Sequence, residues 1–179
     1  MGKYVRVLSK CSIWRLDILM IFVTLGSQDK QFLRLVKEVD RLVKEKVITD
    51  EVIVQAGVTK LDTKRIKILD YIDVSDFKKY MVESDYIIAH GGVGSILDAM
   101  KLGKKIIAVP RDPKYDEIAN DHQKEIIEEF AKKRYIIGCK DVKDLRKAIL
   151  KVNSFKPESY VSNNEKFVDL IDNFIQNNM

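Results

Sequence analysis

Residues 86–111 read YIIAHGGVGSILDAMKLGKKIIAVPR, and this stretch decides the fold. A short run of apolar residues, Tyr86–His90, has the length and the Ile content of a strand buried on both faces, and a glycine-rich turn follows it. Ser95–Leu102 then has the apolar spacing of a helix, with Gly103 as a good stop signal. A second strand-like run follows at residues 105–110. A strand, a helix and a second strand in this order indicate a parallel sheet covered by helices.

The same alternation extends in both directions from this stretch. Short runs rich in Ile and Val alternate with segments of helical period, of which the clearest has an apolar stripe from Phe32 to Val43 and charged residues outside it. We predict strands at residues 21–25, 52–55, 65–69, 86–90, 105–110 and 135–138, and helices over that stripe and at residues 76–83, 95–102, 123–133, 144–152 and 164–176. The expected fold is an α/β, Rossmann-like parallel sheet with helices on both faces.

The length of the chain favours one domain. Its 179 residues, 46% of them hydrophobic, are enough for one core but too few for two Rossmann-like domains. We expect this domain over residues 20–152, and a loop with a packing helix over residues 153–179. Residues 1–19 are interpreted as an extension, either an upstream segment before a natural start at Met20 or a basic surface anchor that carries Trp14.

Charge and cysteine content exclude several classes of function. Lys and Arg outnumber Asp and Glu by 32 to 27, and this small excess, without visible clustering, argues against a nucleic-acid-binding face and only weakly suggests anionic lipid head groups. Cys11 and Cys139 have no ligand-type spacing, so no disulfide framework or zinc site is indicated and a cytoplasmic setting follows. No apolar run reaches the ~18 residues that a membrane-spanning helix needs.

Two loops at predicted strand ends are suited to binding an anion. They are Thr24–Gln28 after the first strand and His90–Ser95 after the fourth, and ligands of open parallel sheets bind at such carboxyl ends. In the second loop the glycines allow close approach of the backbone, and we expect Ser95 to cap the following helix with its amides exposed to phosphate. Neither loop has a Walker or GxGxxG pattern, which makes ATP and NAD poorer candidates.

Polar side chains extend this site along the chain. Asp98 follows Ser95 by about one helical turn, where its carboxylate either accepts bonds from ribose hydroxyls or complements the helix dipole. Arg111 ends the fifth strand, and a polar cluster stands at the start of the next helix, suited to reading sugar hydroxyls or a base edge. Position alone favours simple helix capping by its members Asn120 and Asp121. The whole cluster is Glu117, Asn120, Asp121, His122 and Gln123.

These motifs together resemble a known family. The order VTLGSQ, VIVQAG, SDYIIAHGGVGSILDAMKLGKKIIAVPR and NDHQKEI resembles the glycosyltransferase domain of the PssE type in exopolysaccharide synthesis. It is also similar to the catalytic subunit of the two-part transferase that adds the second N-acetylglucosamine to the dolichol-linked N-glycan precursor, and to the C-terminal half of MurG. The resemblance covers about residues 20–152, and the insert at residues 112–115 favours the PssE branch. The first loop, GSQDKQF, departs from the family pattern.

The resemblance implies the donor-binding half of a GT-B glycosyltransferase. The HGGxGS loop would meet the diphosphate of a UDP-sugar, Asp98 the ribose, and the pair His122–Gln123 the donor sugar, while His90 is either a site residue or a histidine packed to shape the loop. The implied catalytic residues are His122, Gln123 and His90, and the implied donor-binding residues are Gly26, Ser27, Gly91, Gly92, Gly94, Ser95, Asp98, Arg111 and Asp121.

The implied reaction is inverting transfer of a hexosyl group. An acceptor hydroxyl on a polyprenyl-diphosphate-linked sugar attacks C1, while loop amides, the helix dipole and Arg111 stabilise the departing UDP. We expect neither a metal nor a cofactor besides the UDP-sugar substrate, and we expect a membrane-anchored partner to supply the general base and the acceptor side at the inner face of the membrane. The alternatives are a non-catalytic nucleotide-sugar-binding or stabilising subunit of a transferase complex, and a UDP-sugar epimerase, which ordinarily has a longer chain or a bound NAD.

Overall fold

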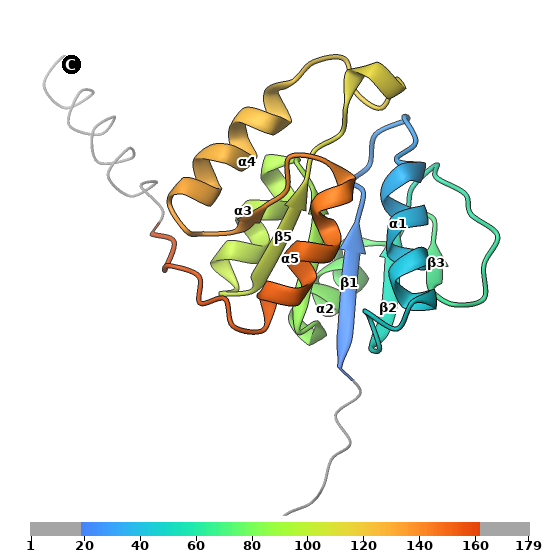
Figure 1. Cartoon of the computed structure of the whole chain (residues 1–179), viewed down its shortest axis with the longest axis horizontal. Helices are drawn as coiled ribbons and strands as arrows, with labels where there is room; N and C mark the ends of the chain where they lie inside the picture. The colour runs from blue at the N-terminus through green and yellow to red at the C-terminus, as the bar shows by residue number, and fades with distance from the viewer. Residues whose placement is uncertain (1–18, 162–179) are drawn as a thin grey trace, which may run out of the picture.

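A computed structural model describes residues 19–161 as one parallel sheet with helices on both faces (Figure 1). The predicted N-terminal extension, apart from Leu19, and the predicted helix at residues 164–176 lie outside the described residues. In chain order the elements are β1 (Met20–Thr24), α1 (Leu33–Lys44), β2 (Glu51–Gln55), β3 (Lys67–Leu69), α2 (Val74–Glu83), β4 (Tyr86–His90), α3 (Val93–Lys101), β5 (Lys105–Val109), η1 (Pro113–Tyr115), α4 (His122–Lys132), β6 (Ile137–Gly138), η2 (Val142–Asp144) and α5 (Leu145–Val152).

The order of the strands creates a position for a ligand. The six strands run β3-β2-β1-β4-β5-β6, and every neighbouring pair is parallel. The chain moves from β1 outward through β2 to β3 at one edge, then returns to β4 on the other side of β1. The loops that follow β1 and β4 therefore lead to helices on opposite faces of the sheet. In open parallel sheets, ligands usually bind in the crevice between two such loops.

Alternating side chains of each strand pack into two cores. Ile21 and Val23 of β1 point into the core beneath α1 and α5, whereas Phe22 points into the core beneath α2, α3 and α4. This arrangement confirms the predicted fold class, because strands covered by helices on both faces have no polar face and appear as continuous apolar runs. None of the helices within residues 19–161 is long and apolar enough to cross a membrane.

Two helices begin earlier than their apolar spacing predicts. α2 begins at Val74 because Asp73 accepts a hydrogen bond from the backbone N–H of Asp76 at 2.8 Å. α3 begins at Val93 with Gly92 at the N-cap, so the prediction that Ser95 caps this helix is wrong. Ser95 lies inside the first turn. The N-cap residue, Gly92, has no side chain, so it cannot make a side-chain hydrogen bond to the start of the helix.

Candidate functional site

A cavity of about 320 Å³ opens at the carboxyl end of the sheet, where the chain leaves β1 and β2. Its walls come from the first glycine loop, the loop that leads into α2, and one side of α3. It brings together four residues that the sequence analysis placed in a donor site, Gly26, Ser27, Ser95 and Asp98. The other lining residues are Thr24, Gln55, Tyr71, Ile72, Asp73, Val74 and Phe77.

The N-terminus of α3 is the main electrostatic feature of this site. The N–H groups of Val93, Gly94 and Ser95 belong to the first turn, where a helix has no carbonyl partners for them. No side chain caps the helix, and its first turn has no acidic residue. The positive end of the helix dipole is therefore uncompensated within the described residues and is available to an anion.

Asp98 shares the cavity with Ser95, as their spacing of three residues predicts. Its carboxylate lies beyond the first turn of α3, so it does not neutralise the end of the helix dipole. The side chain is exposed to solvent beside the cavity. Of the two interpretations weighed from position, the geometry thus favours a carboxylate that accepts hydrogen bonds from a ligand.

The glycines of the second loop have different surroundings. A Cβ atom added to Gly92 would lie 2.3 Å from Nε2 of His90, and one added to Gly91 would lie 2.6 Å from Cβ of Gln123. Both glycines are thus required by close packing inside the protein. A Cβ atom at Gly94, in the first turn of α3, would meet nothing within 4 Å, so packing inside the protein does not require glycine there.

His90 packs between the two glycine loops. Its Nδ1 lies 3.3 Å from the carbonyl oxygen of Thr24, and a Cβ atom on Gly26, whose φ is +77°, would lie 2.6 Å from its ring. Burial, together with the nearby charge of Arg111, lowers the pKa of His90 to about 4. The neutral ring therefore shapes both loops, and of the two roles considered for His90 the geometry favours this one.

Gln55 fixes the first glycine loop from the end of β2. Its Nε2 donates to the carbonyl of Gly26 at 3.0 Å, and its Oε1 accepts a bond from the Thr24 hydroxyl at 2.9 Å. Gln55, and the Tyr71 and Phe77 side chains that line the same cavity, were not among the predicted site residues. A polar residue that ends an otherwise apolar strand is the signal that would have identified Gln55.

The expected pair His122–Gln123 divides between surface and interior. Gln123 is buried, and its Oε1 accepts a hydrogen bond from the Arg111 backbone N–H at 3.0 Å. His122 is exposed at the first position of α4, with its Nδ1 3.4 Å from Glu125. Neither residue lines the 320 Å³ cavity.

The N-terminus of α4 differs in part from the predicted capping. Asp121 occupies the N-cap position without accepting a side-chain cap bond, and instead pairs with Lys124 at 2.8 Å. Asn120 provides the bond to the helix start, because its Oδ1 accepts from the N–H of His122 at 3.3 Å. Of the two expected capping residues, Asn120 therefore makes the contact.

The side chain of Arg111 is buried, whereas the sequence predicts that it contacts the diphosphate of the donor. Only 1% of the residue is exposed, and its guanidinium donates to the carbonyls of Leu25, Lys30, Gln31 and Glu117 over 2.8–3.2 Å. Its Nε is the one buried side-chain polar atom in the described part of the chain that lacks a hydrogen-bond partner. Since these carbonyls hold the guanidinium inside the protein, Arg111 supports the loop between β1 and α1 instead of contacting a diphosphate.

A second arginine holds the loop that follows β5. Arg34 of α1 makes a two-bond contact with the buried carboxylate of Glu117, at 2.9 and 2.7 Å. Its guanidinium also lies 4.0 Å from the centre of the Tyr115 ring and 3.2 Å from Asp141. The pairing connects three segments distant in sequence. It could not be predicted from the sequence, because nothing local marks Arg34 as the partner of Glu117.

This fold and site define a class of protein. A parallel sheet of order 3-2-1-4-5-6, with a cavity at the carboxyl strand ends beside an uncapped helix, is a Rossmann-like domain. It matches the C-terminal domain of GT-B glycosyltransferases. The chain belongs to the glycosyltransferase family 28 C-terminal domain family, whose model matches residues 20–174.

Curated relatives come from fungi. The UDP-N-acetylglucosamine transferase subunit ALG13 of Candida albicans is 32% identical over 113 residues, which are 63% of this chain and 33% of that protein. The subunit of the same name from Debaryomyces hansenii is 34% identical over 80 residues, 43% of this chain and 34% of that protein. The chain thus spans about a third of the length of these relatives.

Solved structures share the fold at low sequence identity. The solution structure of ALG13 superimposes with a TM-score of 0.59 at 22% identity, covering 85% of this chain and 94% of that one. A structure of S. aureus MnaA with UDP has a TM-score of 0.59 at 17% identity, covering 89% and 47% of the two chains. A UDP-N-acetylglucosamine 2-epimerase has a TM-score of 0.53 at 17% identity, covering 77% and 35%. Because transferases and epimerases share this fold, the fold alone does not define the reaction.

Proposed function

We propose that this chain is the donor-binding subunit of an inverting glycosyltransferase. It binds a UDP-sugar and, with a membrane-anchored partner, transfers the sugar to a polyprenyl-diphosphate-linked saccharide at the inner face of the membrane. The observation that carries the proposal is the cavity at the carboxyl end of the sheet, which is lined by Ser95, in the uncapped first turn of α3, and by Asp98. The names of the curated relatives support N-acetylglucosamine as the donor sugar.

For each part of a UDP group, this site has residues of suitable chemistry. The first amides of α3 suit the diphosphate, since they supply fixed donors and the positive end of a helix dipole. Asp98 suits the ribose hydroxyls as an acceptor of two hydrogen bonds. The apolar side chains of Ile72, Val74 and Phe77, with the exposed ring of Tyr71, suit the flat face of a nucleobase.

The chemistry of this domain is stabilisation of the leaving group. An acceptor hydroxyl oxygen bonds to C1 of the sugar as the bond from C1 to the UDP oxygen breaks, and the hydroxyl proton goes to a general base. Negative charge collects on the departing diphosphate, and in this proposal the first amides of α3 stabilise that charge. The partner supplies the base in this proposal, because His90 is buried and neutral. His122, exposed at the start of α4, is the residue of this chain proposed to approach the donor sugar, with Gln123 behind it.

Calorimetry with UDP tests the site. We expect Asp98→Asn to weaken UDP binding about tenfold, because a charge-assisted hydrogen bond contributes about 1.5–3 kcal/mol. We expect Gly94→Val to abolish binding, because we propose that the diphosphate binds at this turn of α3. Thermal unfolding should show that Gly94→Val is folded and not less stable, since the position is helical and glycine is a poor helix former.

The matched control is Asp62→Asn, which removes the same charge from an exposed loop residue outside the cavity. Its affinity for UDP should equal that of the unchanged chain. Unchanged affinity in both Asp98→Asn and Gly94→Val would refute the assignment of the site. The epimerase alternative is tested in the same samples by adding UDP-N-acetylglucosamine and following its C2 epimer by NMR, where we expect no product.

A further inference from the structure

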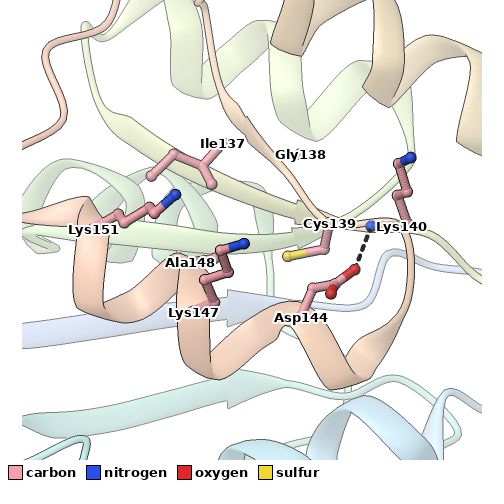
Figure 2. Close-up of a pocket in the computed structure, with 8 residues that line it drawn as sticks. All are labelled: Ile137, Gly138, Cys139, Lys140, Asp144, Lys147, Ala148 and Lys151. Carbon is pink, nitrogen blue, oxygen red and sulfur yellow. Dashed lines mark hydrogen bonds between the residues drawn. The ribbon is translucent and has the colours of Figure 1, made fainter.

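Positive charge gathers at one edge of the sheet, although the sequence shows no obvious cluster. Two adjoining depressions of about 330 and 470 Å³ border the edge strand β6, and both are lined by Ile137 and Lys151. Lys140 and Lys147 line the first depression, and Lys156 lines the second. Figure 2 shows Lys140, Lys147 and Lys151 around the first depression, with the last two side by side along α5. Four lysines that are spread over 17 positions of the sequence, 140 to 156, thus border one surface.

These four lysines have no salt bridge with any carboxylate of the described residues. The one acidic side chain in the depressions is Asp144, and its Oδ2 accepts bonds from the backbone N–H groups of Lys140 and Asp141 at 3.0 and 3.2 Å. Two lysines of the neighbouring helix α4 differ in this respect, since Lys124 and Lys132 pair with carboxylates. Within residues 19–161, no carboxylate therefore competes with an external anion for the ammonium groups at the β6 edge.

An exposed leucine accompanies this charge. Leu150 lies on α5 between Lys147 and Lys151 and is 70% exposed, although the other apolar residues of that helix are buried. Leu150 lines neither depression, but it is exposed on the same helix as Lys147 and Lys151, and an exposed leucine beside cationic side chains fits the boundary between the head groups and the acyl chains of a bilayer. Nucleic-acid-binding faces instead use Arg for bidentate contacts and exposed aromatic rings for stacking, and the lining of these depressions includes one Arg, paired with Glu158, and one half-buried aromatic ring, Phe155.

We propose that this surface, formed by Lys140, Lys147, Lys151, Lys156 and Leu150, binds an anionic membrane. It shares no lining residue with the UDP cavity, so both can be occupied at once. The inference does not rest on the proposed function, because it follows from the distribution of charge and exposed apolar area alone. Each lysine near an anionic bilayer strengthens binding about fivefold, so four act together as a substantial attachment.

Co-sedimentation of the full chain with vesicles tests this inference. We expect the chain to bind vesicles that mix phosphatidylcholine with phosphatidylglycerol, to release with added salt, and not to bind vesicles of phosphatidylcholine alone. The variant in which Lys140, Lys147, Lys151 and Lys156 are all replaced by Gln should bind more weakly by at least about 50-fold. Leu150→Ser alone should weaken binding about fivefold through lost apolar burial.

The matched control replaces four exposed lysines that line neither depression, Lys37, Lys64, Lys78 and Lys79, by Gln and so removes the same net charge. It should bind vesicles like the unchanged chain, and because both variants keep residues 1–19, their difference isolates the β6 edge. Equal losses in the two variants would overturn the inference, as would unchanged binding in the first. The inference would also be overturned if inorganic phosphate, at a concentration equal to that of the lipid phosphate, displaced the chain from the vesicles. Tighter binding of single-stranded RNA than of vesicles would overturn it as well. UDP affinity should be the same in all these variants, which separates this result from the donor site.

Discussion

His90 fills the space between the two glycine loops, and this burial predicts how stability depends on pH. The pKa of His90 is about 4 in the folded protein and about 6.5 in the unfolded chain, so the unfolded chain binds more protons between these values. The contribution to stability is complete above about pH 6.5 and is lost as the pH falls toward about 4. We expect the free energy of unfolding in urea to decrease by about 2 kcal/mol between about pH 8 and about pH 5.

The second histidine of the chain provides the control for this measurement. His122→Gln should keep the same dependence on pH, because His122 is exposed. His90→Gln should flatten it, since an amide can donate to the Thr24 carbonyl but does not titrate. A profile that is equally steep in His90→Gln and in the unchanged chain would contradict the assigned burial.

Asp98 and Arg111 show which side-chain positions could be predicted from the sequence and which could not. Asp98 could be predicted because its spacing from Ser95 is local, and one helical turn places both on one side of α3. Arg111 was misplaced because a lone arginine at a strand end looks the same whether its side chain turns toward a ligand or toward backbone carbonyls. The contacts that decide this come from residues 25–31, about 80 positions away.

At the scale of elements, the pairing of α1 with the loop after β5 predicts a large difference between two glutamates. Glu117→Gln removes the charge from the buried partner of Arg34 and should cost about 2–3 kcal/mol of stability. Glu38→Gln removes the charge from one of the two carboxylate partners of Arg41, which is half exposed on α1, and should cost less than about 0.5 kcal/mol. Urea unfolding of both variants measures the difference.

The same substitution should loosen a particular segment. The backbone N–H of Asp112 donates to Oε2 of Glu117 at 3.0 Å, so its hydrogen exchange should quicken in Glu117→Gln but not in Glu38→Gln. Equal stabilities of the two variants, or unchanged exchange at Asp112, would show that the ion pair does not hold the loop.

Elements were easier to predict than their first residues. The strands follow from apolar runs between turn residues, and that signal is complete within each segment. The start of α3 was placed two residues too late because the search was for a side chain that caps, whereas Gly92 ends the turn without one. This displacement matters for function, since it places Gly94 within the row of free amides.

At the scale of the whole molecule, the order of the strands could not be predicted from the sequence. Periodicity identifies a strand but not its neighbours, and the pairing of β1 with β4 joins residues 65 positions apart. The cavity depends on that pairing, because it gathers side chains from β1, β2, the loop before α2, and α3. The predicted site residues therefore had correct local contexts but no common geometry until the sheet was assembled.

The proposed active site is divided between this chain and a partner chain. In the proposed function the described residues bind the diphosphate at the start of α3, Asp98 binds the ribose, and the general base comes from the partner chain. We expect the purified chain to bind UDP but to transfer no radiolabelled sugar, and transfer to begin when a membrane-anchored partner and a lipid-linked acceptor are added. Gly94→Val should still assemble with that partner, since a Cβ atom at Gly94 meets nothing within 4 Å, yet the complex should be inactive because we propose that the diphosphate binds at this turn of α3. Rapid transfer by the chain alone would contradict a divided active site, whereas an active Gly94→Val complex would show that the donor binds elsewhere.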